Sequence, residues 1–193
     1  MPRLSEPLRI VAGNELALPD EQLARMVARG RGSLRMILGN DACRYRLLHQ
    51  SINWDRLLFA FHGNEAVGHA SFKHGGRGPF SPSGQAFVDE FGRCRGWLRF
   101  ALYRFTEYRE RHHAFFLYGL RVGKEHRRQG IATALIEAVC AQARALGADT
   151  VALEVLGRNR GARQLYLRNG FRLASRLPLP GLHVLGMRRR LAP

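Results

Sequence analysis

The sequence has no long apolar run and few cysteines. No segment reaches the roughly 18–20 consecutive apolar residues that a membrane-spanning helix needs. Residues 1–6 carry no apolar run behind a basic start, so we expect no signal peptide. Cys43, Cys94 and Cys140 are odd in number and lack metal-ligand spacing, which favours free thiols in a reducing compartment. We therefore expect a cytoplasmic protein with no membrane association and no bound metal.

Acidic residues and lysines are also scarce. The chain has 15 Asp and Glu against 31 Lys and Arg, a net charge of +16, and Lys73 and Lys124 are its only lysines. An arginine excess can reflect a GC-rich coding sequence, or it can attract an anionic partner such as nucleic acid or an acidic protein. The arginines are spread along the chain, with local clusters at 25–35, 93–99 and 188–190, and this spread favours the first explanation. Nucleic acid is a possible partner but is not favoured.

Several catalytic patterns are missing too. The sequence contains no P-loop, no nucleophile elbow and no metal-ligand spacing, and it has no internal repeat or low-complexity tail. With 193 residues, of which 46% are hydrophobic, we expect a single domain over residues 1–193 with its own core.

Short apolar strands alternate with helical patterns along the chain. Strands are expected at 8–12, 57–62, 66–73, 115–122, 151–156, 171–177 and 183–191, the last two joined by a turn at 178–181. Helices are expected from Pro19-Asp20-Glu21 to Gly30 and Gly32, from Ser33 or Asp41 to about 51, and over 86–111, 131–146 and 160–168. This order predicts a mixed α/β sheet with helices on both faces.

The segment from about 74 to 112 stands out between two expected strands. A loop rich in Gly, Pro and Ser precedes the helical stretch 86–111, which Gly92 and Gly96 interrupt and can break in two. Apolar residues fall roughly on one face of that stretch, namely Phe87, Phe91, Leu98, Leu102 and Phe105. We expect an insert that either covers a substrate site or forms a dimer contact.

The turn between strand 115–122 and helix 131–146 is suited to holding a phosphate. The first amides of a helix lack internal partners, and the helix dipole favours negative charge there. Arg127, Arg128 and Gly130 lie at that point, and the glycine allows close approach to the backbone. Together they predict an anion site for a pyrophosphate.

This turn resembles the acetyl-CoA motif Gln/Arg-x-x-Gly-x-Gly/Ala of the GCN5-related N-acetyltransferase (GNAT) superfamily, present here as Arg127-x-x-Gly130-x-Ala132. A second half-motif follows, consisting of Leu153-Glu154-Val155, Asn159, Ala162, Leu165-Tyr166 and Gly170-Phe171. The resemblance covers about residues 115–172. It implies a GNAT-like α/β fold, with a twisted, mostly antiparallel sheet of about seven strands and a helical insert at 74–112 before the fourth strand.

The resemblance also implies acetyl-CoA as co-substrate and assigns residues to it. The thioester arm would enter a gap between the parallel fourth and fifth strands and bond to main-chain groups of Leu120, Arg121 and Val122. A main-chain N–H there can stabilise the oxyanion. The diphosphate would lie on Arg127, Arg128, Gln129, Gly130, Ile131 and Ala132. Asn159 is expected to cap the next helix or to bond the cofactor arm, near Ala162.

Tyr166 is the first candidate for a chemical residue. A phenol of pKa about 10 is protonated at neutral pH and can donate to the departing thiolate. Since a thiol of pKa about 8.5 is the stronger acid, the hydrogen bond alone can supply much of the help. The alternative is a core tyrosine on an amphipathic helix.

Glu154 is the second candidate, because a carboxylate inside an apolar strand needs a partner or a role. The spacing of Glu154, Asn159 and Tyr166 is similar to that of the ribosomal-protein N-terminal alanine acetyltransferases, where the matching glutamate is the proposed base and the tyrosine the proposed acid. The N-terminal half does not share this likeness, so that substrate is not carried over. The alternative is an exposed carboxylate paired with an arginine. His112 and His113 are expected to be solvated.

These observations predict an N-acetyltransferase that moves an acetyl group from acetyl-CoA to a primary amine by direct attack in a ternary complex. Two alternatives stay open. One is a tRNA- or aminoacyl-tRNA-directed acetyltransferase that uses the basic surface, and the other is a non-catalytic acyl-CoA-binding module. The acceptor cannot be identified from the sequence, and a homodimer is a further possibility.

Overall fold

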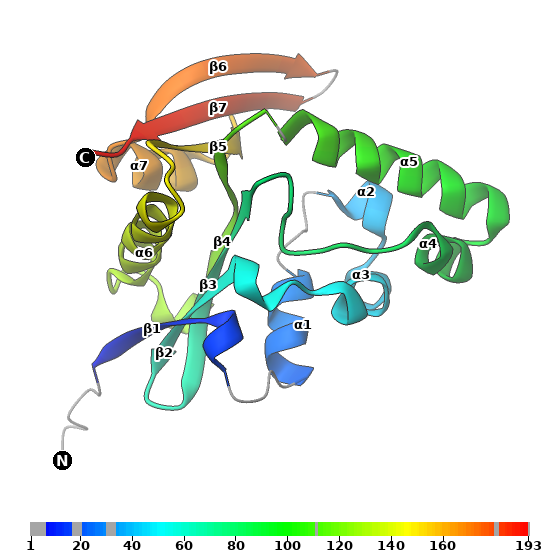
Figure 1. Ribbon diagram of the computed structural model, residues 1–193, viewed down its shortest axis with the longest axis horizontal. Helices are drawn as coiled ribbons and strands as arrows, with labels where there is room; N and C mark the ends of the chain where they lie inside the picture. The colour runs from blue at the N-terminus through cyan, green and yellow to red at the C-terminus, as the bar shows by residue number, and fades with distance from the viewer. Residues whose placement is uncertain (1–6, 17–20, 30–33, 111, 180–181, 193) are drawn as a thin grey trace.

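The computed structural model describes residues 7–16, 21–29, 34–110, 112–179 and 182–192. One sheet of seven strands runs through this part of the chain (Figure 1). The strands are β1 (Leu8–Ala12), β2 (Leu57–His62), β3 (Glu65–His74), β4 (Phe115–Val122), β5 (Thr150–Leu156), β6 (Arg172–Leu179) and β7 (Leu182–Arg190). Their order is β1-β2-β3-β4-β5-β7-β6, and every neighbouring pair is antiparallel except the parallel pair β4–β5. The predicted mixed, mostly antiparallel sheet is confirmed.

The helices largely match the predicted ranges. They are α1 (Glu21–Arg29), α2 (Arg35–Leu38), α3 (Asp41–Leu48), α4 (Gly84–Phe91), α5 (Arg93–Glu110), α6 (Ile131–Ala145) and α7 (Arg160–Arg168). Short 3-10 turns are η1 (Gly13–Glu15), η3 (His49–Ser51), η4 (Trp54–Arg56) and η5 (Lys124–His126). No described helix is long and apolar enough to cross a bilayer. The predicted helix ends at Pro19, Asp20, Gly30, Gly32 and Ser33, and part of the predicted turn at 178–181, lie outside the described residues.

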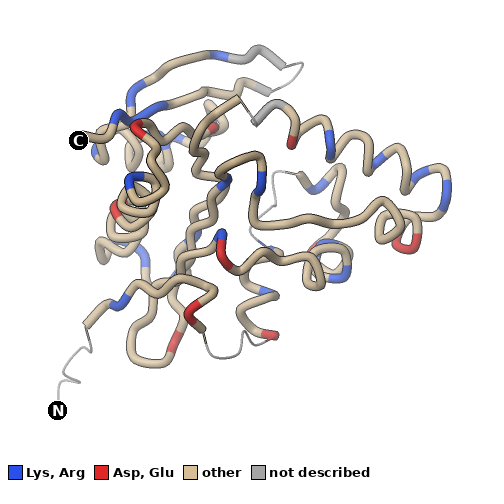
Figure 2. The backbone as a smooth tube through the Cα atoms, in the orientation of Figure 1, with Lys and Arg blue, Asp and Glu red and all other residues tan. Residues whose placement is uncertain are grey.

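Helices cover both faces of the sheet, as predicted (Figure 1). The apolar stripe of α6 includes Leu135 and Val139, which belong to one core cluster with Leu153 and Val155 of β5. Ala152 of β5 belongs to a second cluster on the opposite face. That second cluster joins the sheet to α1, α3, α4 and α5. Basic residues are distributed over most of the elements (Figure 2).

The strands β4 and β5 separate soon after they meet. They share only two residue pairs, Phe116 with Ala152 and Leu117 with Leu153. Just beyond this point the register between β3 and β4 shifts, which leaves Tyr118 as an extra residue in β4. Such a bulge bends a strand and increases its twist. The rest of β4 therefore diverges from β5 and leaves an open cleft between them.

The helical insert is broken once, at Gly92. Gly92 has a φ of +80° and ends α4, whereas Gly96 continues α5. A Cβ at Gly96 would lie 2.5 Å from the carbonyl oxygen of Phe87, so this glycine permits close packing of α5 on α4. The predicted single apolar face is wrong. Phe87 is fully buried, while Leu98 is 63% exposed, because the break redirects the second helix.

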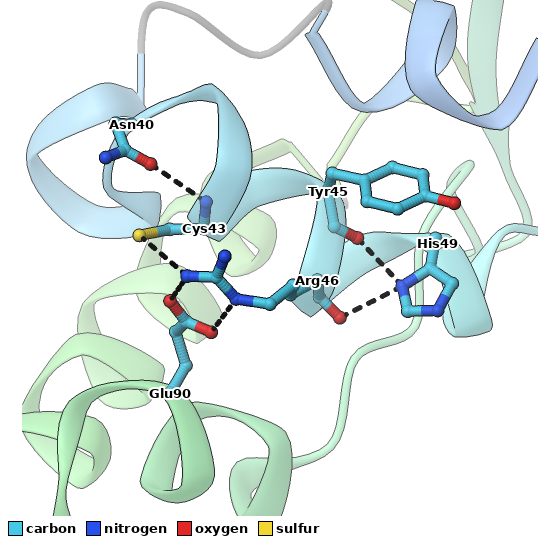
Figure 3. A network of polar contacts seen from close by, with 6 residues as sticks. All are labelled: Asn40, Cys43, Tyr45, Arg46, His49 and Glu90. Atoms are coloured by element: carbon cyan, nitrogen blue, oxygen red, sulfur yellow. Dashed lines mark hydrogen bonds and ion pairs between the residues drawn. The ribbon is translucent and has the colours of Figure 1, made fainter. Parts of the chain in front are cut away.

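Polar contacts fasten the insert to the rest of the fold. Figure 3 shows a bidentate ion pair between Arg46 of α3 and Glu90 of α4. The Arg46 Nε and Nη2 atoms donate to the two carboxylate oxygens of Glu90 at 2.8 Å and 2.5 Å. Deeper in the molecule, Glu107 of α5 forms an ion pair with Lys73 of β3 at 2.6 Å and accepts a hydrogen bond from the Tyr118 hydroxyl at 2.9 Å. The second group ties α5 directly to the bulge of β4.

His69 of β3 is a buried imidazole in the second core. It is 3% exposed and packs near the ring of Phe59, and its Nδ1 has no hydrogen-bond partner among the described residues. Burial, together with the neighbouring charge of Arg121, lowers the pKa of His69 to about 4. The native protein therefore holds this side chain neutral.

We predict that His69 makes the protein acid-sensitive. Because the pKa falls from 6.5 in the unfolded chain to about 4 in the folded one, the contribution to stability is complete above pH 6.5 and is lost as the pH falls toward 4. The loss is on the order of 3 kcal/mol. In His69→Gln the free energy of unfolding, measured by denaturant titration, should fall less over this pH range. An identical fall in both proteins would contradict the assignment.

Candidate functional site

A cavity of about 700 Å³ lies at the end of β4 and brings most of the predicted site residues together. Its lining includes the predicted residues Leu120, Arg121, Val122, Arg127, Arg128, Gly130, Ile131, Ala132, Ala162 and Tyr166. Thr133, Gly161 and Arg168 also line it and were not expected from the sequence, and the lining further includes Leu165 of the second half-motif and His126 of the turn. The helical spacing of Ala162, Leu165 and Tyr166 was the available signal for the α7 wall.

The turn before α6 exposes main-chain amides to this cavity. Gly130 caps the helix with a φ of +81°, and Arg128, with a φ of +64°, is the only described residue other than glycine with a positive φ. No side chain caps α6, so the amides of Ile131, Ala132 and Thr133 lack helical partners. A Cβ built on Gly130 would meet no atom within 4 Å, so the space before the turn is open. This arrangement fits a diphosphate.

The cavity is positively charged. The lining includes Arg121, Arg127, Arg128 and Arg168, and it contains no Asp or Glu. The positive end of the α6 dipole adds to their field.

Two of the residues predicted to bind the cofactor do not line this cavity. The Gln129 side chain donates to the Glu125 carbonyl at 3.3 Å. Asn159 caps α7, since its side chain accepts a hydrogen bond from the Ala162 amide at 3.1 Å. The predicted cap is therefore confirmed.

The open edge of β4 offers main-chain groups to an extended ligand. One edge of the strand pairs with β3 as far as Val122, while pairing with β5 ends at Leu117. Leu120, Arg121 and Val122 lie beyond that point and line the cavity. An extended thioester arm can therefore add to this edge as a further strand would.

Tyr166 is placed on the α6 side of the sheet. It is 9% exposed and contributes to the wall of the cavity, and its ring lies edge-on to that of Phe171 with the ring centroids 5.7 Å apart. Burial raises the pKa of Tyr166 to about 12, because the charged phenolate is poorly solvated there. The side chain is therefore a neutral hydrogen-bond donor at all physiological pH values.

Glu154 lies on the other face of the sheet. It follows Leu153, the last residue of β5 that pairs with β4. Side chains alternate along a strand, so Glu154 shares the face of Ala152, which belongs to the second core, whereas Tyr166 belongs to the first. The structure does not place the two candidates in one cavity. It places them on either side of the separating strands.

Glu154 lines a second cavity of about 350 Å³. The other lining residues are Phe105, Tyr108, His112, His113, Ala152, Leu153, Ala174, Ser175, Gly186, Met187 and Arg188. Contrary to expectation, His113 is half-buried and stacks on Phe116 at 5.4 Å. Burial lowers the pKa of His113, and the neighbouring charge of Arg188 lowers it too. No local pattern marked His113 or Arg188, because the pairing of β5 with β7 brings them here.

Within the described part of the chain, no group of three or more His, Cys, Asp or Glu side chains is placed to hold a metal ion.

Comparisons with known proteins agree with this geometry. The model of the acetyltransferase (GNAT) family matches residues 33–171. A solved structure described simply as an acetyltransferase has a TM-score of 0.59 at 17% identity, covering 95% of this chain and 100% of that one. Ard1 from Thermoplasma volcanium has a TM-score of 0.56 at 15% identity, with coverages of 97% and 98%. A GNAT family acetyltransferase from Elizabethkingia anophelis with acetyl-CoA bound has a TM-score of 0.53 at 12% identity, covering 95% of this chain and 98% of that one. These likenesses show a shared fold. Among curated proteins, none matches the sequence.

We predict that Gly130→Ala weakens CoA binding about tenfold, the equivalent of one lost hydrogen bond, because alanine would pull the turn out of its left-handed conformation and reorient the amides. Calorimetry with CoA measures the effect. Gly147→Ala is the matched control, since Gly147 has a φ of +75°, also has open space at its Cβ, and lies outside the cavity lining. Each variant should lose about 1–2 kcal/mol of stability. Equal affinities for CoA in both variants would refute the role of the turn.

Proposed function

The chain belongs to the GNAT family of acetyl-CoA-dependent acetyltransferases, and we propose that it acetylates a primary amine by direct attack in a ternary complex. The observation that carries this proposal is the cleft between β4 and β5. A basic turn follows β4 and lines one cavity together with Tyr166, and Glu154 lines a second cavity on the opposite face of the sheet.

We propose that the first cavity holds the cofactor. The exposed amides of α6, with Arg127 and Arg128, would bind the diphosphate. The open edge of β4 from Leu120 to Val122 would hold the pantetheine arm by main-chain hydrogen bonds. The bound cofactor supplies the acetyl group as a thioester.

Glu154 would prepare the acceptor in this mechanism. An amine must be neutral to attack, and the carboxylate of Glu154 can take the proton that the ammonium group releases. As the C–N bond formed, the C–S bond would break, the electron pair would leave with sulfur, and the nitrogen would lose its second proton to solvent to become the amide. A main-chain N–H of β4 would stabilise the oxyanion formed in between.

Tyr166 would act on the departing sulfur from the opposite face. Because burial raises its pKa to about 12, Tyr166 is a poor proton source for a thiolate whose conjugate acid has a pKa of about 8.5. Its contribution is therefore a hydrogen bond to the developing negative charge, and solvent supplies the final proton. Of the two roles expected from the sequence, proton transfer and hydrogen bonding, the raised pKa favours hydrogen bonding.

Other features of the chain stay predictions. They are the single domain over 1–193 with an insert at 74–112, the cytoplasmic location, the homodimer, and the RNA-directed alternative that the net charge of +16 supports.

We predict that Glu154→Gln lowers kcat/KM for a primary amine about a hundredfold near pH 7. The deficit should shrink as the pH approaches the pKa of the amine, because solvent then supplies the neutral form. Thiol release from acetyl-CoA measures the rate over this pH range. A deficit that is constant with pH would exclude Glu154 as the base.

We also predict that Tyr166→Phe lowers kcat by about a hundredfold, with little change in the Kd of CoA, since the hydrogen bond forms as sulfur becomes negative. The parent enzyme should show no alkaline decline due to Tyr166 below its pKa of about 12. An unchanged kcat in the variant would remove Tyr166 from the mechanism.

A further inference from the structure

The helix α5 presents a face of large, exposed apolar side chains. Four side chains at helical spacing form this face, here called the α5 stripe: Leu98, Leu102, Phe105 and Tyr108, which are 63%, 45%, 62% and 53% exposed. The opposite side of the same helix is packed, since Tyr103 is only 3% exposed. From Leu98 to Tyr108 the stripe is about 15 Å long, at about 1.5 Å per residue. A continuous exposed patch of large apolar side chains marks a binding surface.

The stripe leads into the cavity that contains Glu154. Phe105 and Tyr108, at its C-terminal end, line that cavity together with His112, His113 and Glu154. The ring of Tyr108 is edge-on to His112 at 5.8 Å. A molecule that placed its amine beside Glu154 would therefore continue outward along α5. A cavity of about 350 Å³ accommodates the reacting end, and the stripe accommodates an elongated remainder.

Charge around the stripe indicates an acidic occupant. Arg95 and Arg104 are exposed on α5 beside it, and Figure 2 shows basic residues recurring along the helix. Glu107 does not offset them at the surface, because it is engaged with Lys73 and Tyr118. Carboxylates of a partner would pair with the arginines, while its apolar side chains cover the stripe.

The stripe excludes two other occupants on physical grounds. A second copy of the chain, paired symmetrically through α5, would bring two sets of arginines together, each from a molecule of charge +16. A double-stranded RNA would place its phosphates against the large apolar side chains of the stripe. Its bases, stacked inside the duplex, would not cover those side chains.

We propose that the α5 stripe docks the acceptor, and that the acceptor is the N-terminal segment of an acidic polypeptide with apolar side chains. This inference rests on the proposed function. The α-amino group, of pKa about 8, suits a carboxylate base better than a lysine side chain of pKa about 10.4, because far more of it is neutral at pH 7. The polypeptide supplies the length, the apolar side chains and the carboxylates that the stripe requires.

The test uses a peptide of about ten residues with a free α-amino group, leucine and phenylalanine at helical spacing, and aspartates between them. Leu98→Ser and Leu102→Ser each remove part of the stripe without touching the lining of the Glu154 cavity. Leu173→Ser on β6 is the matched control, since Leu173 is 46% exposed and lies outside α5 and that cavity. Calorimetry in the presence of CoA gives the Kd of the peptide, and thiol release gives kcat/KM for the peptide and for ethylamine.

Each stripe variant should raise the Kd of the peptide about tenfold, and lower the ratio of kcat/KM for the peptide to that for ethylamine by a similar factor. The control should change neither. The proposal would be overturned if all variants bound the peptide equally well. It would also be overturned if the parent protein were a dimer that the stripe variants dissociate, or if tRNA bound to the stripe and the peptide did not.

The two proposals fail in different ways. If no amine is acetylated but the peptide binds and the stripe variants weaken it, the docking surface stands without the reaction. If ethylamine is acetylated but the peptide neither binds nor reacts, the docking surface is wrong and the acetyltransferase activity stands.

Discussion

The separation of β4 from β5 is the constraint on which the rest of the site depends. Two strands that paired along their whole length would satisfy each other's main-chain groups and leave nothing for a ligand. Here the pairing stops at Leu117 and Leu153, and the bulge at Tyr118 turns β4 away. The same geometry aims Leu120 to Val122 at one cavity and Glu154 at the other.

The insert helps to hold this separation in place. Glu107 of α5 contacts both Lys73 and the bulge residue Tyr118, in a group that is largely removed from solvent. Burying an ion pair costs desolvation energy, which a good geometry and an added hydrogen bond offset. The insert therefore has a structural reason to lie where it does, while the α5 stripe on its outer side stays exposed.

The two faces of the sheet carry cavities with different linings. The α6 side supplies a basic cavity without carboxylates and a neutral, buried phenol. The other side supplies Glu154, the half-buried His113 and the apolar end of α5. The two cavities therefore differ in charge and polarity, as the proposed binding of a thioester in one and an amine in the other requires.

The sequence by itself determined the local features. It predicted the strands, the helix at 131–146, the cap at Asn159 and the turn at 127–132, because each depends on residues within a few positions of one another. It did not show that Glu154 and Tyr166 lie on opposite faces, that His113 is half-buried, or that Leu98, Leu102 and Phe105 point outward while Phe87 points inward. Periodicity shows that a face is apolar but not what lies against it. Only the tertiary structure decided those points, because they depend on strand pairing and helix packing between residues far apart in the chain.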